Sequence, residues 1–206
     1  MLKQACLARP GGPSVLTLCL AICAAALSFP IRGAQIAGGA DGDGVLDLKG
    51  KPVDLFASPA AVQVLLFVRT DCPITNRYAP ELQRLHSEFA SRKVNFWLVY
   101  ADPAETAAGI EAHVAGYRFP GVPVRDPHHM LVKRAHATTA PEAAVFDAAG
   151  TLRYHGRIDD RYVDIGKARA QADIHDLENA ILAVLAGKAV AEPETRAIGC
   201  SLADVE

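Results

Sequence analysis

The stretch Val62–Tyr78 reads VQVLLFVRTDCPITNRY and decides the fold of the chain. Val62–Val68 is almost continuously apolar, which is typical of a β-strand covered on both faces. Asp71, Cys72 and Pro73 interrupt this run. Proline is favoured at the first position of a helix, because the N–H that it lacks has no partner there. The stretch therefore predicts a buried strand that leads directly into a helix, with Cys72 at the junction.

The rest of the chain continues this alternation of strands and helices. The expected helices comprise Tyr78, Leu82, Leu85 and Phe89, then Ala107, Ile110, Val114 and Tyr117, a short helix from His129 to about His136, and Ile174, Leu177, Ile181, Val184 and Leu185. The expected strands are residues 94–100 and a hairpin formed by 143–146 and 152–155. Residues 118–128 contain three prolines and a glycine and predict a loop. This order predicts an α/β protein with a central mixed β-sheet flanked by helices, the layout of the thioredoxin-like fold.

The composition fits one globular domain with additional segments. The chain has 206 residues, of which 50% are hydrophobic, so a sizeable core is available. Its 21 basic and 23 acidic residues give a net charge of −2. A protein that binds nucleic acid through phosphate contacts normally carries a basic excess, so we expect no nucleic-acid partner.

The N-terminal residues 1–34 have the pattern of a secretory signal peptide. Lys3 and Arg9 supply positive charge, and the apolar run 15–27 is too short to span a bilayer but suits the hydrophobic region of a signal. A retained N-terminal anchor is the alternative. The remaining segments are a flexible lead-in at 35–41, a domain at 42–187 and a C-terminal tail at 188–206. We expect an exported protein, periplasmic or extracellular, with no membrane association once the signal is removed.

Signal removal changes the cysteine count of the protein from five to two. Cys6, Cys19 and Cys23 lie in the signal, and Cys72 and Cys200 remain. A thiol at a helix N-terminus is close to free N–H groups, which lower its pKa and make thiolate available at neutral pH. The sequence therefore predicts a reactive thiol at Cys72, with a buried inert thiol as the alternative.

Three segments of the chain resemble the redoxin-type proteins of the thioredoxin superfamily, both AhpC/TSA-like and TlpA-like. The matching segments are Phe67–Tyr78 around the cysteine, Ala140–Ala143 and Tyr154–Tyr162. The resemblance covers about residues 42–187. It implies that Cys72 is the attacking cysteine and that Pro141 is the cis-proline beside it, although Pro141 also suits an ordinary loop. Many such proteins are exported thiol–disulfide oxidoreductases or thiol peroxidases.

The chain departs from both patterns of that family. A dithiol member would carry Cys-x-x-Cys, but Thr75 stands where the second cysteine belongs. A peroxiredoxin site carries a threonine and a proline upstream of its cysteine. In this chain Thr70 is too close to Cys72 to be that threonine, and the upstream proline is missing. The Thr75 hydroxyl is one helical turn from Cys72, so it can either hydrogen-bond the thiolate or simply cap the helix.

Three further features have more than one interpretation. Cys200 follows a glycine in a flexible tail, where it can resolve a disulfide at Cys72, form a permanent structural bridge, or stay unpaired or bond to another molecule. Arg157, in a charged cluster after the hairpin, can approach the thiolate or a substrate, or it belongs to a surface ion-pair network. His128, His129 and His136 lack the spacing of a closed metal site, so no metal is expected.

These features lead to three hypotheses about function. The first is an exported oxidoreductase in which the Cys72 thiolate attacks a protein disulfide, with Cys200 or an external thiol reductant resolving the mixed disulfide. The second is a thiol peroxidase, in which Cys72 attacks a peroxide to give a sulfenic acid. The third is a non-enzymatic copper-handling module resembling the Sco type. No nucleotide-binding glycine loop, serine elbow or paired-carboxylate motif indicates another class of enzyme. We expect no cofactor.

Overall fold

The computed structural model describes residues 44–202. The predicted signal peptide at 1–34 and lead-in at 35–41 lie outside the described residues, as do residues 203–206 at the end of the predicted tail. Within the described part, no helix is long and apolar enough to cross a membrane.

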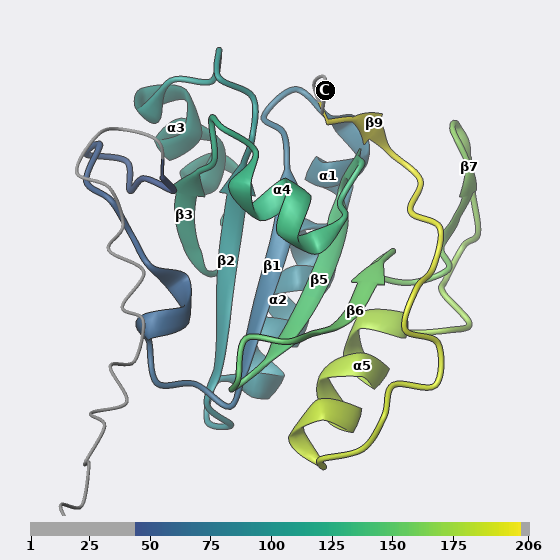
Figure 1. The fold of residues 1–206 in the computed structure, drawn as a ribbon. Helices are drawn as coiled ribbons and strands as arrows, with labels where there is room; N and C mark the ends of the chain where they lie inside the picture. Colours follow the sequence, from purple (N-terminus) through teal and green to yellow (C-terminus); the bar gives the residue numbers. More distant parts are fainter. Residues whose placement is uncertain (1–43, 203–206) are drawn as a thin grey trace, which may run out of the picture. The chain divides into compact units, whose positions relative to one another are not determined.

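A five-stranded mixed sheet forms the centre of the described domain, with the strand order β3-β2-β1-β5-β6 (Figure 1). Its strands are β1 (Val62–Val68), β2 (Val94–Tyr100), β3 (Val122–Arg125), β5 (Glu142–Asp147) and β6 (Leu152–Gly156). Strands β1, β2 and β3 run parallel, whereas β5 is antiparallel to β1 and β6 is antiparallel to β5. The predicted α/β class with a central mixed sheet is confirmed.

Helices cover both faces of this sheet. The helical elements are η1 (Leu55–Ala57), α1 (Pro73–Arg77), α2 (Ala79–Phe89), α3 (Ala107–Tyr117), α4 (Met130–Ala135) and α5 (Asp176–Leu185). Buried side chains of α2, α3 and α5 share one core with one face of β1, and those of α4 and η1 share a second core with its other face. Helix α4 crosses in front of the sheet and α2 lies behind it in Figure 1.

Four short strands lie outside the central sheet. Strand β4 (Thr139–Ala140) pairs with β9 (Cys200–Ser201), and β7 (Tyr162–Asp164) pairs with β8 (Lys167–Ala168). Strand β9 comes from the C-terminal tail and runs antiparallel to β4. The tail therefore returns to the domain through a backbone pairing.

Strand β1 has the most buried environment in the sheet. All seven of its residues are buried, as its continuous apolar sequence predicts. Most of its neighbours in register are also apolar, for example Leu98 and Ala143 on either side of Leu66. Because β1 is central and covered on both faces, its C-terminal end is a rigid point from which the chain leads to Cys72.

The predicted loop at 118–128 is wrong, since it contains strand β3 (Val122–Arg125). Pro123 lies inside this strand. Strand β3 is at the edge of the sheet, with β2 as its neighbouring strand and a single bridge from Arg125 to Leu46 on its other side. At such an edge a proline that cannot donate a hydrogen bond is tolerated. The three prolines of residues 118–128 indicated a loop, although the segment contains a short edge strand.

The bounds of two helices differ from those that the apolar spacing predicted. The stripe from Tyr78 to Phe89 does not belong to one helix with Pro73, because α1 ends at Arg77 and α2 begins at Ala79. Pro80 has no N–H to continue the hydrogen-bond pattern of α1, which accounts for the break. Ile174 precedes α5 and is 47% exposed, so the last helix begins two residues later than expected.

We expect Leu66→Ala to lower the free energy of unfolding by about 2–5 kcal/mol, because it leaves a cavity in a core strand. Leu66 is 1% exposed and belongs to the core shared with α2 and α5. Urea denaturation under reducing conditions measures the change. Val163→Ala, at a position 39% exposed, serves as the control and should change stability by less than about 0.5 kcal/mol. Equal effects at the two positions would contradict this description of the core.

Candidate functional site

Cys72 lies where β1 gives way to α1. It is the N-cap residue of α1, and Pro73 occupies the first helical position, as the sequence predicted. The side chain is fully buried. Its Sγ donates a hydrogen bond to the carbonyl oxygen of Ala140 at 3.2 Å. The thiol thus faces β4, the short strand just before Pro141.

Cys200 lies directly against this thiol. The two Sγ atoms are 2.6 Å apart, and both cysteines are unbridged. In the β4–β9 pairing, Cys200 is the register partner of Ala140, the residue whose carbonyl accepts the Cys72 hydrogen bond. Backbone pairing therefore determines where the second sulfur lies. The structure brings together the two cysteines that are 128 positions apart in sequence.

The predicted cis-proline is present at the same place. The Ala140–Pro141 peptide bond is cis. Pro141 separates β4 from β5, so the residues before it pair with the tail while those after it pair with β1. Cys72, Pro141 and Cys200 consequently form one site at the end of the central strand.

The expectation of a flexible tail is wrong for residues 193–202. The His155 N–H donates to the Pro193 carbonyl at 3.0 Å, and the Thr195 N–H donates to the His155 carbonyl at 3.1 Å. At the far end, the Leu202 N–H donates to the Thr138 carbonyl at 3.0 Å, and Leu202 is 3% exposed. The tail contains no periodic apolar pattern, so the sequence carried no sign of this attachment.

Two glycines permit the close approach of the tail. A Cβ at Gly199 would lie 2.0 Å from the carbonyl oxygen of Ala140, so only glycine fits before Cys200. Gly156 has a φ of 141° and faces Thr195, whose carbonyl oxygen would be 2.2 Å from a Cβ at that position. Both positions of close backbone contact therefore depend on the absence of a side chain.

The electrostatic environment separates the two thiols. Burial disfavours the Cys72 thiolate, but hydrogen bonds from the Cys200 thiol and from Thr75 outweigh it and lower the pKa of Cys72. Burial together with the neighbouring Cys72 raises the pKa of Cys200 to about 12. The shared proton therefore stays on Cys200, and Cys72 is the thiol that ionises first.

Thr75 supports the Cys72 thiolate, as one of its two predicted roles requires. It is fully buried, and its hydroxyl oxygen has no hydrogen-bond partner among the described residues. Both its hydroxyl and its backbone N–H lower the pKa of Cys72. The Thr75 hydroxyl is thus a hydrogen-bond donor with no other partner in the described part of the chain, and the Cys72 thiolate is the acceptor that it can stabilise.

A buried polar chain behind α1 was missed by the sequence reasoning. His113 of α3 contacts Asn76 of α1 through Nε2 at 2.6 Å, and its Nδ1 lies 2.9 Å from the hydroxyl of Tyr100. The Asn76 oxygen can only accept, so Nε2 carries the proton and Nδ1 accepts from Tyr100. This chain ties α1 to α3 and β2. Burial lowers the pKa of His113, which keeps the imidazole neutral.

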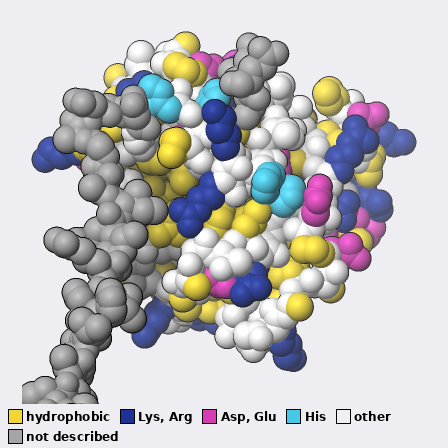
Figure 2. Space-filling view, viewed as in Figure 1, with side chains coloured by type: hydrophobic (Ala, Val, Ile, Leu, Met, Phe, Trp, Pro, Cys, Tyr) yellow, Lys and Arg dark blue, Asp and Glu magenta, His cyan; other side chains and the backbone are white. Residues whose placement is uncertain are grey.

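A second group of polar side chains lies under the tail. Glu142, directly after Pro141, is 4% exposed and accepts hydrogen bonds from the N–H groups of Thr138 and Thr139 at 2.9 and 3.1 Å. His155 lies between two carboxylates, with Nδ1 3.5 Å from Glu142 and Nε2 3.7 Å from Glu194. On the face shown in Figure 2, one patch of histidine (cyan) lies next to an acidic side chain (magenta). No role for Glu142 was predicted, because nothing in its local sequence pattern reveals that it is buried.

The placement of Arg157 favours the ion-pair interpretation. Its guanidinium forms two hydrogen bonds with Asp176 at the start of α5, at 2.7 and 3.2 Å. No hydrogen bond joins it to either sulfur in the part of the chain that the structure describes. Its backbone N–H instead donates to the Thr195 hydroxyl at 3.1 Å, which helps to hold the tail. Arg69 is the basic residue nearer the site, since its guanidinium donates to the Ser201 carbonyl at 3.0 Å.

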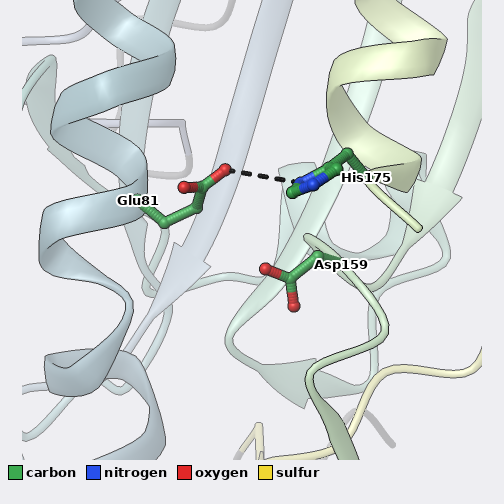
Figure 3. Close-up of side chains that lie close together, drawn as sticks. All are labelled: Glu81, Asp159 and His175. Carbon is green, nitrogen blue, oxygen red and sulfur yellow. Dashed lines mark ion pairs between the residues drawn. The ribbon is translucent and has the colours of Figure 1, made fainter. Parts of the chain in front are cut away.

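One group of described side chains is close enough together to ligate a metal ion, and it differs from the histidines considered from the sequence. Glu81, Asp159 and His175 each offer a ligand atom within 4.8 Å of the others (Figure 3). Arg84 already forms an ion pair with Glu81 at 2.7 Å, and the Tyr78 hydroxyl donates to Asp159 at 2.5 Å. Internal partners thus engage both carboxylates.

Comparison with known proteins gives the family of the chain. The sequence profile described as the AhpC/TSA family matches residues 40–155. The chain belongs to the AhpC/TSA family. A search of curated proteins found no match.

Solved structures support the thioredoxin-like fold of this AhpC/TSA protein. A hypothetical protein from Sinorhizobium meliloti is 23% identical with a TM-score of 0.64, and covers 76% of this chain and 87% of its own. A conserved uncharacterized protein from Geobacillus kaustophilus is 22% identical with a TM-score of 0.64, covering 79% and 88%. A Chlorobium tepidum protein, proposed to be the thiol:disulfide interchange protein DsbE, is 17% identical with a TM-score of 0.54, covering 71% and 99%.

Replacing Thr75 by valine should make Cys72 less acidic, because valine keeps the shape of threonine but removes the hydroxyl that stabilises the thiolate. We expect alkylation of Cys72 by iodoacetamide at neutral pH to slow on the order of tenfold, as for loss of a hydrogen bond to a charged group. Mass spectrometry of the Cys72 peptide over a pH series measures the rate. Thr75→Ser retains the hydroxyl and should keep the wild-type profile. If the valine variant titrates like wild type, the hydroxyl does not support the thiolate.

His113 should make the stability of the fold depend on pH in one direction. Burial lowers its pKa in the folded state below the usual 6.5, so the unfolded chain binds the proton more readily. Stability is then greatest above about pH 6.5 and falls as the solution is acidified. Urea denaturation at several pH values measures this decline. In His113→Phe the decline between about pH 8 and pH 5 should be smaller, and an unchanged pH dependence would contradict the assignment.

Proposed function

We propose that this AhpC/TSA protein is a thiol–disulfide oxidoreductase in which Cys72 is the nucleophile and Cys200 is the resolving thiol. The observation that carries the proposal is the 2.6 Å separation of the two Sγ atoms at the end of the central strand. Thr75 occupies the position of the second cysteine in a Cys-x-x-Cys motif, and β9 supplies that thiol from the tail instead. The site thus has the two sulfurs that disulfide exchange needs.

The first step is attack of the Cys72 thiolate on one sulfur of a protein disulfide. The substrate S–S bond breaks, a mixed disulfide forms, and the other substrate sulfur leaves as a thiolate that takes up a proton. The lowered pKa of Cys72 increases its share of thiolate over that of an ordinary thiol. Before the substrate binds, Cys200 stays protonated, because its pKa is raised by burial and by Cys72.

The second step releases the reduced substrate. Once Cys72 is bonded to the substrate it carries no negative charge, so one cause of the raised pKa of Cys200 disappears. Cys200 then loses its proton and attacks the Cys72 sulfur, which forms the Cys72–Cys200 disulfide and frees the second substrate thiol. The substrate has gained two electrons and the protein has lost two. An external dithiol reductant returns them to Cys72 and Cys200 in a second exchange.

Export to an oxidising compartment is part of the same proposal. The sequence of residues 1–34 supports it, with its basic start and its apolar run. The Chlorobium tepidum protein of similar fold is itself proposed to be a thiol:disulfide interchange protein. The partners that this function requires are a protein disulfide and an external thiol reductant.

Reduction of a protein disulfide such as that of insulin, with a dithiol as electron source, tests the proposed roles. Cys72→Ser should abolish turnover. Cys200→Ser should lower turnover by at least about tenfold and accumulate a mixed disulfide at Cys72, because the resolving thiol is missing. Mass spectrometry detects that intermediate, and dimedone labelling after peroxide treatment reports any peroxidase chemistry at Cys72.

Ser201→Ala is the matched tail control for these cysteine variants. It alters the neighbouring residue of β9 without removing a thiol and should leave turnover unchanged. Wild-type turnover in Cys200→Ser would remove Cys200 from the mechanism. Strong dimedone labelling without disulfide reduction would replace the proposal with a peroxidase.

A further inference from the structure

The last described part of the tail is attached at its two ends and spans a cavity between them. We call residues 193–202 the strap. A cavity of about 710 Å³ lies beneath its middle and is lined by His136, Glu142 and His155 on one side and by Glu194 and Gly199 on the other. In Figure 1 this segment, drawn in yellow, runs from the level of β6 to β9. The two attachments differ in strength.

The first attachment is a network centred on Thr195. Its hydroxyl is 2.7 Å from the Tyr154 hydroxyl and accepts the Arg157 N–H at 3.1 Å. Its backbone N–H donates to the His155 carbonyl at 3.1 Å, and its main chain is pressed against Gly156. These contacts involve both side chain and backbone and do not depend on either cysteine.

The second attachment is short and ends at the site. It consists of the two-residue pairing of β9 with β4, the Leu202 N–H bond to Thr138, and the Arg69 bond to the Ser201 carbonyl. Leu202 is the last described residue and is 3% exposed. A two-strand pairing of this length is weak by itself. A disulfide between Cys200 and Cys72 would hold this second attachment in place for as long as the bond is oxidised.

The second attachment also hides the reactive thiol. Cys72 is fully buried, with Cys200 on one side and the Ala140 carbonyl on another. A protein disulfide reaches Cys72 only if β9 moves away. The chain therefore needs a state in which the strap is lifted.

We propose that the strap is a redox-controlled cover, closed when Cys72 and Cys200 form a disulfide and able to lift about its attachment at Thr195 when both are reduced. Lifting exposes Cys72 and the backbone of β4. This inference rests on the proposed function, since disulfide exchange at Cys72 supplies both states. It adds that the same reaction opens and closes access to the site.

The exposed β4 edge fits one kind of partner, an extended protein segment with a small residue before its reacting cysteine. An extended segment can form the backbone hydrogen bonds that β9 forms in the closed state. Gly199 shows the steric limit, because a Cβ at that position would lie 2.0 Å from the Ala140 oxygen. A substrate segment that replaces β9 in the same register meets the same limit.

Amide hydrogen exchange of the intact chain tests the strap directly. The Leu202 amide, which bonds to Thr138, reports the second attachment, and the Thr195 amide, which bonds to His155, is the internal control. We expect reduction of the Cys72–Cys200 disulfide to speed exchange at Leu202 by at least about tenfold, with Thr195 unchanged. Equal protection of Leu202 in the two redox states would overturn the proposal. Simultaneous loss of protection at both amides would also overturn it, because the tail would then detach as a whole.

Two disulfide-linked peptides test the partner. One carries the sequence of residues 197–202 (AIGCSL) and the other replaces its glycine by valine. We expect the protein, supplied with a dithiol, to reduce the glycine peptide at least about tenfold faster. Equal rates would overturn the β4 edge as the docking site, and reduction of neither peptide would count against the proposed function. The exchange measurement needs no turnover, so failure of the strap and failure of the proposed function are distinguishable.

Discussion

The backbone pairing of Ala140 with Cys200 is the interaction on which the rest of the site depends. Ala140 accepts the hydrogen bond of Cys72 with its carbonyl and lies opposite Cys200 in the β4–β9 register. One residue thereby sets the position of both sulfurs. Central strand β1 fixes the start of α1, and the strap brings the tail to the same point. Side-chain chemistry at the site follows from this backbone geometry.

The order in which the two thiols ionise follows from their mutual contact. Because the sulfurs share one proton at short range, stabilising the Cys72 thiolate necessarily makes Cys200 the weaker acid. Thr75 adds to this asymmetry from the α1 side, where a Cys-x-x-Cys protein would have its second thiol. The substitution of threonine for cysteine thus removes one thiol from α1 and retains a hydrogen-bond donor for the other. Cys200 gains access to Cys72 by a different route through the fold.

Most of the fold was predictable from local pattern, whereas the missed strand depends on the sheet as a whole. The continuous apolar run of β1 and the Asp-Ala-Ala-Gly turn before β6 specify their structures within a few residues of sequence. Strand β3 was missed because Pro123 is acceptable only at an edge, and edge position is a property of the whole sheet. For the site, the position of Cys72 directly before Pro73 was enough to predict a thiol at the start of a helix. The approach of Cys200 was not predictable, because the contacts of the strap join residues that are far apart in the chain.

The polar residues around the thiols show the same limit. Glu142 and His113 are ordinary residues in their local sequence, and only tertiary burial makes their hydrogen bonds significant. Arg157 was a candidate for contact with the thiolate or a substrate, because it lies in a dense charged cluster. In the structure its guanidinium forms an ion pair with Asp176 instead. For this site, the charged cluster around Arg157 was therefore a poorer guide to the residues near the thiols than the position of Cys72 at the end of β1.

Moving the second thiol from α1 to the tail also changes the energetics of the disulfide. In the chain-entropy model, a bridge between adjacent turns of a helix closes a short loop and stabilises a protein by about 2 kcal/mol, whereas a bridge closing a loop of more than a hundred residues contributes about 5 kcal/mol. Cys72 and Cys200 are 128 positions apart, so their bridge belongs to the second class. The disulfide that the proposed mechanism forms would therefore also stabilise the domain. Reduction would remove that contribution, and the short β4–β9 pairing lies closest to the thiols it concerns.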